Sequence, residues 1–432
     1  MDRKKILIIA TVIILVLGGG IGAYYYFLKK PVTLPPSGNP FPGGGNLVTK
    51  PPLPPDNNPD DGVFPPSNAS TSRLYELHKT PVAGVGFAEQ VNGKKKTFFA
   101  RSLERGLGHI FETNLETLVE SRISGETYPG ITEAFFGNNG KSVIIRSLSE
   151  QEGIAIKTRS LGLTAPTISF APANSDTGEA NIPPPTETNL PDYIPHLGVA
   201  EDGADKIFYM ENSFSSARGS TSNFKGTAIS TIFNSSFTEW LPQLPNQKLA
   251  TLTTKPSSNV PGHLYFIDTQ SSALTKILGD VKGLTTTTSR DGKFVLYTEV
   301  KAGVPNLIAY DVAKKESRPL SLNTLAEKCG WSTKDPVIAY CAIPENPPRG
   351  QYPDQWYQGV ISFSDSMWKI NAKTGFAEKI FTPEKYRGGI MDIINPIVSS
   401  DEAYLVFINK KTSTPWLFML NEKPQIIVPS TQ

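Results

Sequence analysis

The stretch LTTTTSRDGKFVLYTEVKAGVPNLIAYDV, residues 284–312, decides the fold class of this chain. Residues 289–293 contain an Asp-Gly pair, which favours a tight turn because Asp caps its own backbone and Gly takes positive φ at little cost. Apolar, aromatic and β-branched residues follow at 294–297 and, beyond a second turn, at 307–312. Such segments favour strands. The stretch therefore predicts antiparallel strands joined by short turns.

The same turn-then-strand pattern returns along the chain, with turns near residues 139, 203, 291, 334 and 401 and room for a further unit near 237. A spacing of roughly 40–60 residues is typical of four-stranded propeller blades. One blade has exposed edges and little core, whereas a ring of blades covers both. We predict an all-β fold over residues 73–432, a β-propeller of seven four-stranded blades. Six or eight blades remain open, and we expect the outer strands of the last blade at 416–420 and 425–428.

The unit at 289–297, followed by 306–312, resembles a repeat of the TolB-like bacterial β-propellers. Those repeats have a Ser-x-Asp-Gly turn, an apolar strand, a short turn and a strand that ends near Asp. The unit at 399–402 is similar but has Glu402 where Gly is usual. The resemblance implies a propeller and no particular function, because the fold supports many.

An uncharged segment at residues 6–28 precedes the predicted propeller, with basic residues at 3–5 and 29–30. As a helix it would span about 34 Å, which matches a hydrocarbon core of about 30 Å. Tyrosines at 24–26 suit the membrane interface. We predict a single-pass signal anchor in the cell membrane, with 1–5 as a short cytoplasmic tail and the propeller on the extracytoplasmic side. A signal peptide cleaved near Gly20 or Gly22 is the alternative.

Two segments are rich in proline. Residues 29–72 combine Pro with Gly and Asn, a composition that buries no core, and they are predicted to form a disordered tether. Residues 165–195 are rich in Pro, Asn, Ser and Thr and are predicted to be an insertion in the propeller, with a break between two halves as the alternative.

Charge and motifs exclude several function classes. Residues 1–72 hold six of the 42 basic and four of the 40 acidic residues, which leaves 36 of each sign in the predicted propeller. Nucleic-acid binding needs a basic field, so no nucleic-acid partner is expected. The chain lacks the His-Glu-x-x-His and Gly-x-Ser-x-Gly motifs of common hydrolases. We expect no catalytic residue, cofactor or metal site on these grounds.

Cys329 and Cys341 lie at equal distances from Asp335, which belongs to a predicted turn. If the flanking strands pair, the two Cys face each other with Cβ atoms about 4.5–5.5 Å apart, close to disulfide range. An extracytoplasmic domain meets an oxidising compartment. We predict a disulfide between them, with two buried thiols as the alternative.

Residues 346–365 interrupt a predicted blade with aromatic residues among prolines and glycines. Tyr352, Trp356 and Tyr357 are candidate contact residues, because aromatic side chains in a stiff loop bury area at low entropic cost. The alternative is that Trp356 and Tyr357 fill a gap between blades.

Together these observations predict a membrane-anchored binding or scaffold module without catalytic activity, whose partner is another envelope protein or a cell-wall polymer. The alternative is an anchored glycan- or peptide-cleaving enzyme with acids around the propeller channel. Several carboxylates with raised pKa in one funnel would favour the enzyme, and an apolar, aromatic face would favour the scaffold.

Overall fold

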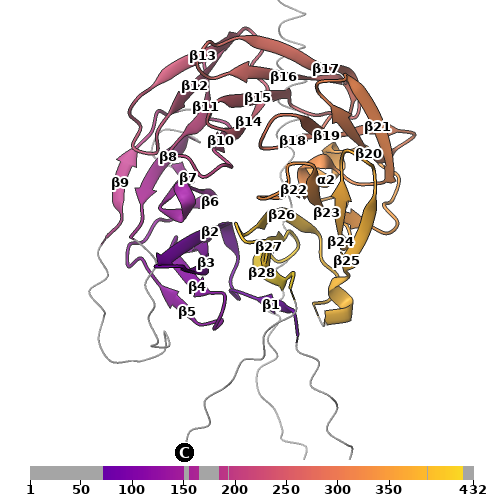
Figure 1. Cartoon of the computed structure of the whole chain (residues 1–432). Coiled ribbons are helices and arrows are strands. Elements are labelled where there is room, and N and C mark those ends of the chain that lie inside the picture. Colours follow the sequence, from indigo (N-terminus) through magenta and orange to yellow (C-terminus); the bar gives the residue numbers. More distant parts are fainter. Residues whose placement is uncertain (1–71, 150–154, 165–183, 193, 387, 422–432) are drawn as a thin grey trace, which may run out of the picture. The chain divides into compact units, whose positions relative to one another are not determined.

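The computed structural model describes residues 72–149, 155–164, 184–192, 194–386 and 388–421. Seven four-stranded antiparallel sheets follow one another around a ring (Figure 1). The predicted seven-bladed, all-β propeller is therefore confirmed. In the first six blades the strands follow chain order from the inner to the outer edge. In blade 7 the outer strand comes from the beginning of the described chain.

The first three blades contain the following strands. Blade 1 comprises β2 (Val82–Asn92), β3 (Lys95–Glu104), β4 (Ile110–Asn114) and β5 (Glu120–Arg122). Blade 2 comprises β6 (Ile131–Gly137), β7 (Ser142–Ser149), β8 (Ala155–Gly162) and β9 (Thr186–Asn189). Blade 3 comprises β10 (Leu197–Val199), β11 (Ile207–Asn212), β12 (Ala217–Ser222) and β13 (Ser230–Ser235).

The other four blades follow the same scheme. Blade 4 comprises β14 (Trp240–Asn246), β15 (Leu249–Thr254), β16 (Pro261–Asp268) and β17 (Leu274–Lys282). Blade 5 comprises β18 (Thr286–Thr288), β19 (Phe294–Lys301), β20 (Val304–Asp311) and β21 (Glu316–Leu322). Blade 6 comprises β22 (Cys329–Trp331), β23 (Ile338–Pro344), β24 (Asp365–Asn371) and β25 (Ala377–Phe381). Blade 7 comprises β26 (Ile393–Val398), β27 (Tyr404–Asn409), β28 (Thr414–Met419) and β1 (Leu74–Glu76).

The ring is closed by strand β1, which comes from the beginning of the described chain. β1 pairs antiparallel with β28, so that Leu74 lies opposite Phe418. It occupies the outer position of blade 7, which the sequence analysis had given to residues 425–428. That segment lies outside the described residues. Pairing of the two ends of the domain removes an open blade edge that would otherwise invite association.

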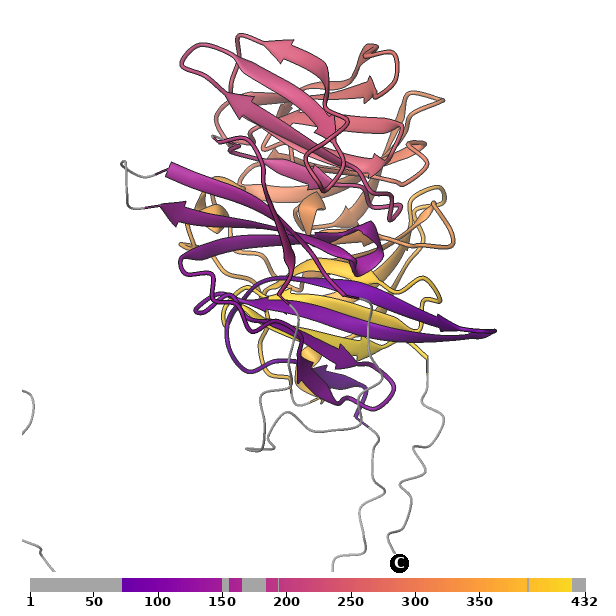
Figure 2. The same ribbon diagram turned by 90° about the vertical axis from the view of Figure 1, so that its left-hand side faces the viewer.

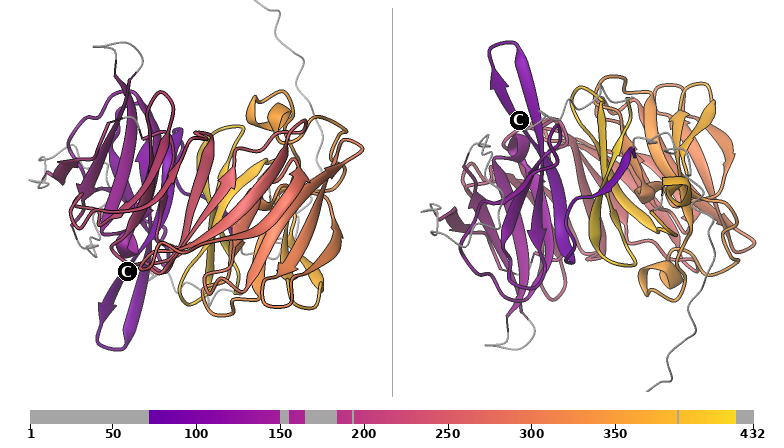
Figure 3. Two further views of the ribbon diagram at one scale, coloured as in Figure 1. Left: turned by 90° about the horizontal axis from the view of Figure 1, so that it is seen from above. Right: turned by 90° about the horizontal axis from the view of Figure 1, so that it is seen from below.

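Alternation of strand direction gives the ring two distinct faces. The connections between first and second strands and between third and fourth strands lie on one face, which we call the turn face. The connections between second and third strands and those from blade to blade lie on the other, the loop face. In Figures 2 and 3 the long hairpin of β2 and β3 projects on the turn face, and in Figure 3 the short helix α2 (Asp354–Tyr357) lies on the opposite side.

The turn in the stretch that decided the fold is closed by its own side chains. Ser289 Oγ donates to Asp291 Oδ1 (2.8 Å) and accepts from the Phe294 amide (2.9 Å). The Lys293 amide donates to the same Asp291 oxygen (3.1 Å). Gly292 has φ +72°, a left-handed conformation that glycine adopts without strain. The Ser-x-Asp-Gly pattern is thus a local hydrogen-bonding unit.

Blade 7 repeats this unit with Glu402 in place of the glycine. Ser399 Oγ donates to Asp401 Oδ1 (2.6 Å) and accepts from the Tyr404 amide (3.1 Å). Glu402 takes the left-handed conformation with φ +56°. Its carboxylate accepts hydrogen bonds from Ser332 Oγ and from the Lys334 amide in blade 6. The departure from the repeat pattern therefore places a bridge between two blades.

The core consists of apolar clusters between neighbouring blades. One large cluster joins Leu296 and Leu307 of blade 5 to Trp331, Ile343 and Ile370 of blade 6, all buried. Sheet faces that pack against each other in this way explain why strands such as β19 and β23 are largely apolar and buried.

The segment expected as an insertion at 165–195 contains strand β9, which pairs with β8. In the chain, the proline-rich residues therefore stand between the third and fourth strands of blade 2. Residues 165–183, like the expected tail at 1–5, the anchor at 6–28 and the tether up to 71, lie outside the described residues. Within the described ranges, no helix is long and apolar enough to span a membrane.

Candidate functional site

Exposed apolar side chains gather on the loop face. In the described part of the chain, eight of the twelve exposed large apolar residues lie in or beside its connections: Leu107, Leu148, Phe214, Phe237, Val260, Tyr357, Val360 and Ile390. The other four lie at the tip of the β2–β3 hairpin or beside turns between third and fourth strands: Val91, Ile229, Leu274 and Phe376. Concentrations of exposed apolar side chains mark interaction surfaces more often than evenly scattered ones do.

The longest described connection on this face, residues 345–364 between β23 and β24, reaches the loops of neighbouring blades. The Gly350 amide donates to Gly303 O of blade 5 (3.0 Å). Asp354 Oδ2 accepts from the Ser258 amide of blade 4 (2.7 Å). Lys410 of blade 7 donates to Trp356 O from the other side of blade 6, and we call residues 345–364 the bridging loop because hydrogen bonds connect it to blades on both sides.

The three aromatic residues expected to contact a partner have different surroundings in this loop. Tyr352 is fully buried, Trp356 is 5 % exposed and Tyr357 is 41 % exposed. Tyr352 and Trp356 both stack on Phe363, with ring centroids 5.7 and 6.3 Å apart. Only Tyr357 thus offers a surface to a partner. Burial of Trp356 agrees with the alternative in which this side chain fills space between blades.

A buried lysine organises the base of the bridging loop. Lys328, which is fully buried, forms ion pairs with Asp365 (2.9 Å) and with Asp392. Its ammonium nitrogen also lies 5.1 Å from the ring centroid of Trp356 and 5.0 Å from that of Phe363. A buried cation needs such partners, because its transfer from water is otherwise very unfavourable.

Asp392 connects this lysine to the loop. Its Oδ2 accepts from the Phe363 amide (3.1 Å), Ser362 Oγ (3.2 Å) and Trp356 Nε1 (3.0 Å). Burial alone would raise the pKa of Asp392, but Lys328 and these donors hold it below the usual value. The carboxylate therefore stays charged and fixes the end of the loop.

Asp365, the second aspartate paired with Lys328, has a raised pKa, in contrast to Asp392. Burial raises its pKa to about 6 in spite of the attraction of Lys328. It accepts one hydrogen bond from the Ile393 amide (2.7 Å). Blades 6 and 7 are thereby joined through one lysine and two aspartates.

Lys410 of blade 7 also contacts Trp356. Its ammonium nitrogen lies 3.9 Å from the Trp356 ring centroid and donates to Trp356 O. Burial lowers the pKa of Lys410. Trp356 thus contacts two lysines and is a packing residue of the loop.

Tyr357 is held by a hydrogen bond to Glu327, a residue of the 3-10 helix η2 (Ala326–Lys328). Tyr357 Oη donates to Glu327 Oε2 (2.9 Å). Burial raises the pKa of Glu327 to about 7, and burial together with the nearby Glu327 carboxylate raises the pKa of Tyr357. The exposed aromatic ring is therefore fixed in place before any partner arrives.

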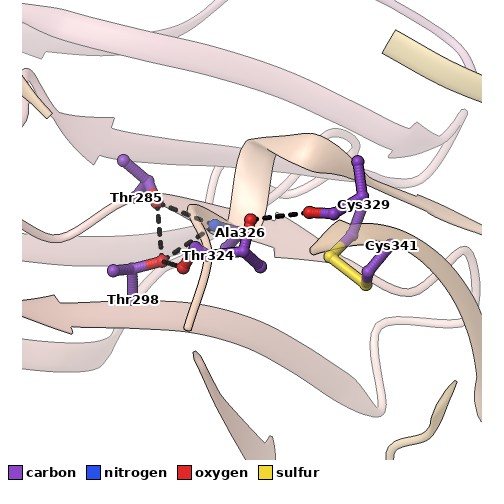
Figure 4. The surroundings of a disulfide bond; sticks show 7 residues. Thr285, Thr298, Thr324, Ala326, Cys329 and Cys341 are labelled. Carbon is purple, nitrogen blue, oxygen red and sulfur yellow. Dashed lines mark hydrogen bonds between the residues drawn. A yellow bond between two sulfur atoms is a disulfide. The ribbon is translucent and has the colours of Figure 1, made fainter. Parts of the chain in front are cut away.

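The predicted disulfide between Cys329 and Cys341 is present (Figure 4). The two residues lie directly opposite each other in the β22–β23 ladder, with Cα atoms 4.0 Å apart. Both side chains belong to the apolar cluster between blades 5 and 6. The bond therefore fixes the inner strand of blade 6 immediately after helix η2.

Buried threonines hold the other end of η2 (Figure 4). The Ala326 amide donates to the hydroxyls of Thr285 (3.0 Å) and Thr298 (2.8 Å). Thr298 Oγ1 in turn donates to Thr324 O (3.1 Å). Since η2 carries both Glu327 and Lys328, this hydrogen-bonded group and the disulfide position the two residues that support the bridging loop.

Glu201 and Glu327, two of the three described acids whose pKa is raised, lie far apart. Glu327 precedes the inner strand β22 on the loop face, whereas Glu201, whose pKa is raised by burial, follows the inner strand β10 on the turn face. The two positions are about 20 Å apart along the inner strands at about 3.3 Å per residue. Glycosidase carboxyl pairs lie about 5–10 Å apart. The described residues also contain no group of three or more His, Cys, Asp or Glu side chains placed to hold a metal ion.

Comparisons with known proteins give similarity in backbone structure and none in sequence. No protein-family model and no curated protein matches this sequence. Its structure aligns with an oligogalacturonate lyase in complex with manganese, with TM-score 0.48 and 10% identity over 81% of this chain and 98% of that one. It also aligns with the β-propeller domain of the Trilobed protease from Pyrococcus furiosus (TM-score 0.46, 11%, 80% and 99%) and with TolB from Acinetobacter baumannii (0.39, 8%, 79% and 80%). Likenesses of this size carry no activity over to this protein.

Sequence reasoning located the bridging loop but missed the residues that support it. Lys328, Asp365 and Asp392 are far apart in the chain, and nothing in their spacing connects them. Their only common feature is that each lies at or beside the end of a strand. This signal is too general to select them among other charged residues.

Proposed function

We propose that this protein is a TolB-like, membrane-anchored extracytoplasmic propeller that acts as a non-catalytic binding module. Its partner is an envelope protein or a cell-wall polymer, and the loop face is the binding face. The observation that carries the proposal is the concentration of exposed apolar side chains on that face. An apolar, aromatic face favours a scaffold over an enzyme.

The bridging loop suits recognition because it is already ordered. Tyr357 and Val360 expose 41 % and 69 % of their surface on a loop held by Asp392, Lys410 and Asp354. A partner would meet an aromatic and a β-branched side chain without the entropic loss of ordering the loop. Fixed aromatic residues of this kind are common centres of binding energy.

The entry point of the chain is compatible with this assignment. Strand β1 runs antiparallel to β28 and begins on the turn face, so the preceding residues reach the ring on that side. A tether at 29–72 would let the domain reach partners at some distance from the membrane.

Site-specific photo-crosslinking in cells tests the proposal. A photoreactive amino acid replaces Val360, Phe214 or Ile390 on the loop face of the full-length protein. Matched control positions, Ile229 and Leu274, are also apolar and exposed but lie near turns on the other face. We expect one reproducible crosslinked envelope protein, or crosslinked wall polymer, from the loop-face positions only. Equal products from both faces, or products from the controls alone, would overturn the assignment.

A further inference from the structure

A cleft opens between blades 5 and 6 near the turn face, opposite the proposed binding face. Its volume is about 260 Å³, and it lies between β20, β21 and the turn that follows β24. The lining residues are Phe294, Ala309, Asp311, Lys314, Glu316, Ser317, Arg318, Pro319, Ala372 and Lys373. Four of these are apolar and five are charged. The cleft therefore combines an apolar floor with a charged rim.

The apolar floor is part of the packed core. Phe294, Ala309 and Ala372 are 8 %, 2 % and 2 % exposed, and they belong to the apolar cluster between the two blades. Small side chains at positions 309 and 372 leave the space that forms the cleft. An apolar group that enters it would meet a fixed surface and not a mobile one.

The charges of the rim do not all neutralise one another. Asp311 accepts a hydrogen bond from the Lys314 amide (3.1 Å) and lies 3.5 Å from the Lys314 ammonium group. Arg318 and Lys373 are exposed, and among the described residues their side chains have neither a hydrogen-bond nor an ion-pair partner. Glu316 is the remaining acid. With Asp311 paired to Lys314, two cations and one acid are left to meet a ligand.

Arg318 is close to the blade 6 side of the cleft. A Cβ atom placed on Gly375 would lie 3.2 Å from Arg318 Cδ, so this turn packs directly against the arginine side chain. Phe376, the next residue, is 65 % exposed. An arginine from blade 5 and a lysine from blade 6 thus lie around one opening.

We infer that this cleft binds a peptide segment that carries an acidic side chain next to an apolar one. The guanidinium of Arg318 offers a planar pair of donors that suits a carboxylate, and Lys373 adds a second cation. The apolar floor accepts the neighbouring side chain. A volume of about 260 Å³ holds one or two side chains and is below the usual range for larger ligands.

This site is independent of the proposed binding face, because the two lie on opposite faces of the ring. The full-length protein is titrated into fluorescein-labelled hexapeptides in which Glu or Asp adjoins Leu, Phe or Val, and binding is followed by fluorescence anisotropy. Amide counterparts with Gln or Asn test the need for the carboxylate. Free acetate and N-acetyl-leucine, used as competitors, distinguish a peptide site from a site for any small carboxylic acid.

We expect saturable binding of acidic peptides that weakens at high salt. Arg318→Gln and Lys373→Gln should each weaken it about tenfold, as removal of a charge-assisted hydrogen bond does. Lys225→Gln is the matched control, because Lys225 is an exposed lysine in the equivalent turn of blade 3. Thermal melting of all variants confirms that they are folded.

Three results would overturn the inference. They are the absence of saturable binding at peptide concentrations up to about 1 mM, equal binding of the amide peptides, and unchanged affinity in both cleft variants. Displacement of the peptide by acetate as effectively as by N-acetyl-leucine would show an anion site without the apolar subsite, and would also contradict it. None of these outcomes affects the crosslinking result expected for the loop face.

Discussion

The two faces of the ring are built from the same strands but are stabilised in different ways. On the turn face, short connections close on themselves, as at Ser289–Asp291 and Ser399–Asp401. On the loop face, a long connection is held by buried charges that come from different blades. The turn face is therefore a product of local sequence, whereas the loop face depends on tertiary contacts.

Contacts between neighbouring blades on the turn face are also short and repetitive. Asn246 Nδ2 donates to Arg290 O (2.5 Å), and the Gln247 amide donates to Asp202 Oδ2 (3.0 Å). Each such bond joins one turn to the next around the ring. The turn face still departs from a plain repeat at the long β2–β3 hairpin and at Glu402, whereas the loop face departs from it at the bridging loop.

Removal of the buried cation is expected to have the largest effect. Lys328→Met leaves Asp365 and Asp392 buried without a positive partner, so the free energy of unfolding should fall by about 3–5 kcal/mol. Urea denaturation followed by tryptophan fluorescence measures the change. The bridging loop should also become more sensitive to limited proteolysis within residues 345–364.

The matched control is Lys255→Met, which breaks an ion pair with Glu239 whose side chains are 54% and 49% exposed. This change should lower the free energy of unfolding by no more than about 1 kcal/mol. Similar losses in the two variants would show that the loop face does not depend on its buried charges.

Loss of the disulfide should have the next largest effect. The double variant Cys329→Ala/Cys341→Ala releases a link between residues separated by 12 positions. Loop-closure entropy predicts a fall of about 3 kcal/mol in the free energy of unfolding. Urea denaturation of the variant and of the oxidised wild type gives the difference. A change below about 1 kcal/mol would mean that the apolar cluster and the threonines alone hold helix η2 and blade 6 together.

The loop face should also respond to pH through Glu327. Its pKa is about 7 in the folded protein and 4.5 in an unperturbed chain. Between these values the folded state binds the proton more tightly than the unfolded state, so stability falls as pH rises through this window. Between pH about 5 and about 8, the free energy of unfolding of wild type should therefore fall by on the order of 2 kcal/mol more than that of Glu327→Gln. This figure includes a reduction for solvent screening.

The comparison with Glu327→Gln isolates this residue, because other titrating groups such as Asp365 are common to both proteins. Tyr357→Phe gives a second check. It removes a hydrogen bond that lowers the pKa of Glu327, so the loss of stability should move to higher pH. Parallel stability curves for wild type and Glu327→Gln would contradict the expectation.

The fold could be predicted because its signals are local. A Ser-x-Asp-Gly turn and the apolar strand after it lie within nine residues, and the repetition of this unit around the chain indicates a ring. The pairing of Cys329 with Cys341 was equally local, since both flank one hairpin. Strand β1 was not placed in blade 7, because nothing in a three-residue segment shows that it pairs with a strand about 340 residues away.

The candidate site was predictable only in part. Aromatic residues among prolines indicated a special loop, but composition does not show which ring is buried. Trp356 is covered by Lys328 and Lys410, and neither contact leaves a trace in the spacing of the sequence. A turn that recurs in every blade gives a repeated sequence pattern, which can be recognised. The packing of a single loop against distant residues gives no such pattern.

The smallest effect is expected at Glu402. This residue belongs to a turn closed by its own side chains and also forms hydrogen bonds to the neighbouring blade. Glycine at this position would accept φ +56° without strain, a gain of about 1 kcal/mol. The same change removes a carboxylate that accepts hydrogen bonds from Ser332, from the Lys334 amide and from Tyr340 (3.5 Å). Hydrogen bonds to a charged group contribute about 1.5–3 kcal/mol, so Glu402→Gly should lower the free energy of unfolding by about 1 kcal/mol.

Glu402→Ala loses the carboxylate and keeps the strain, and should lower the free energy of unfolding by about 2 kcal/mol. Urea denaturation of the three proteins gives their order. If Glu402→Gly is more stable than wild type, the bridge between blades 6 and 7 is weaker than the backbone strain it requires, and the turn face is stabilised within each turn rather than between turns.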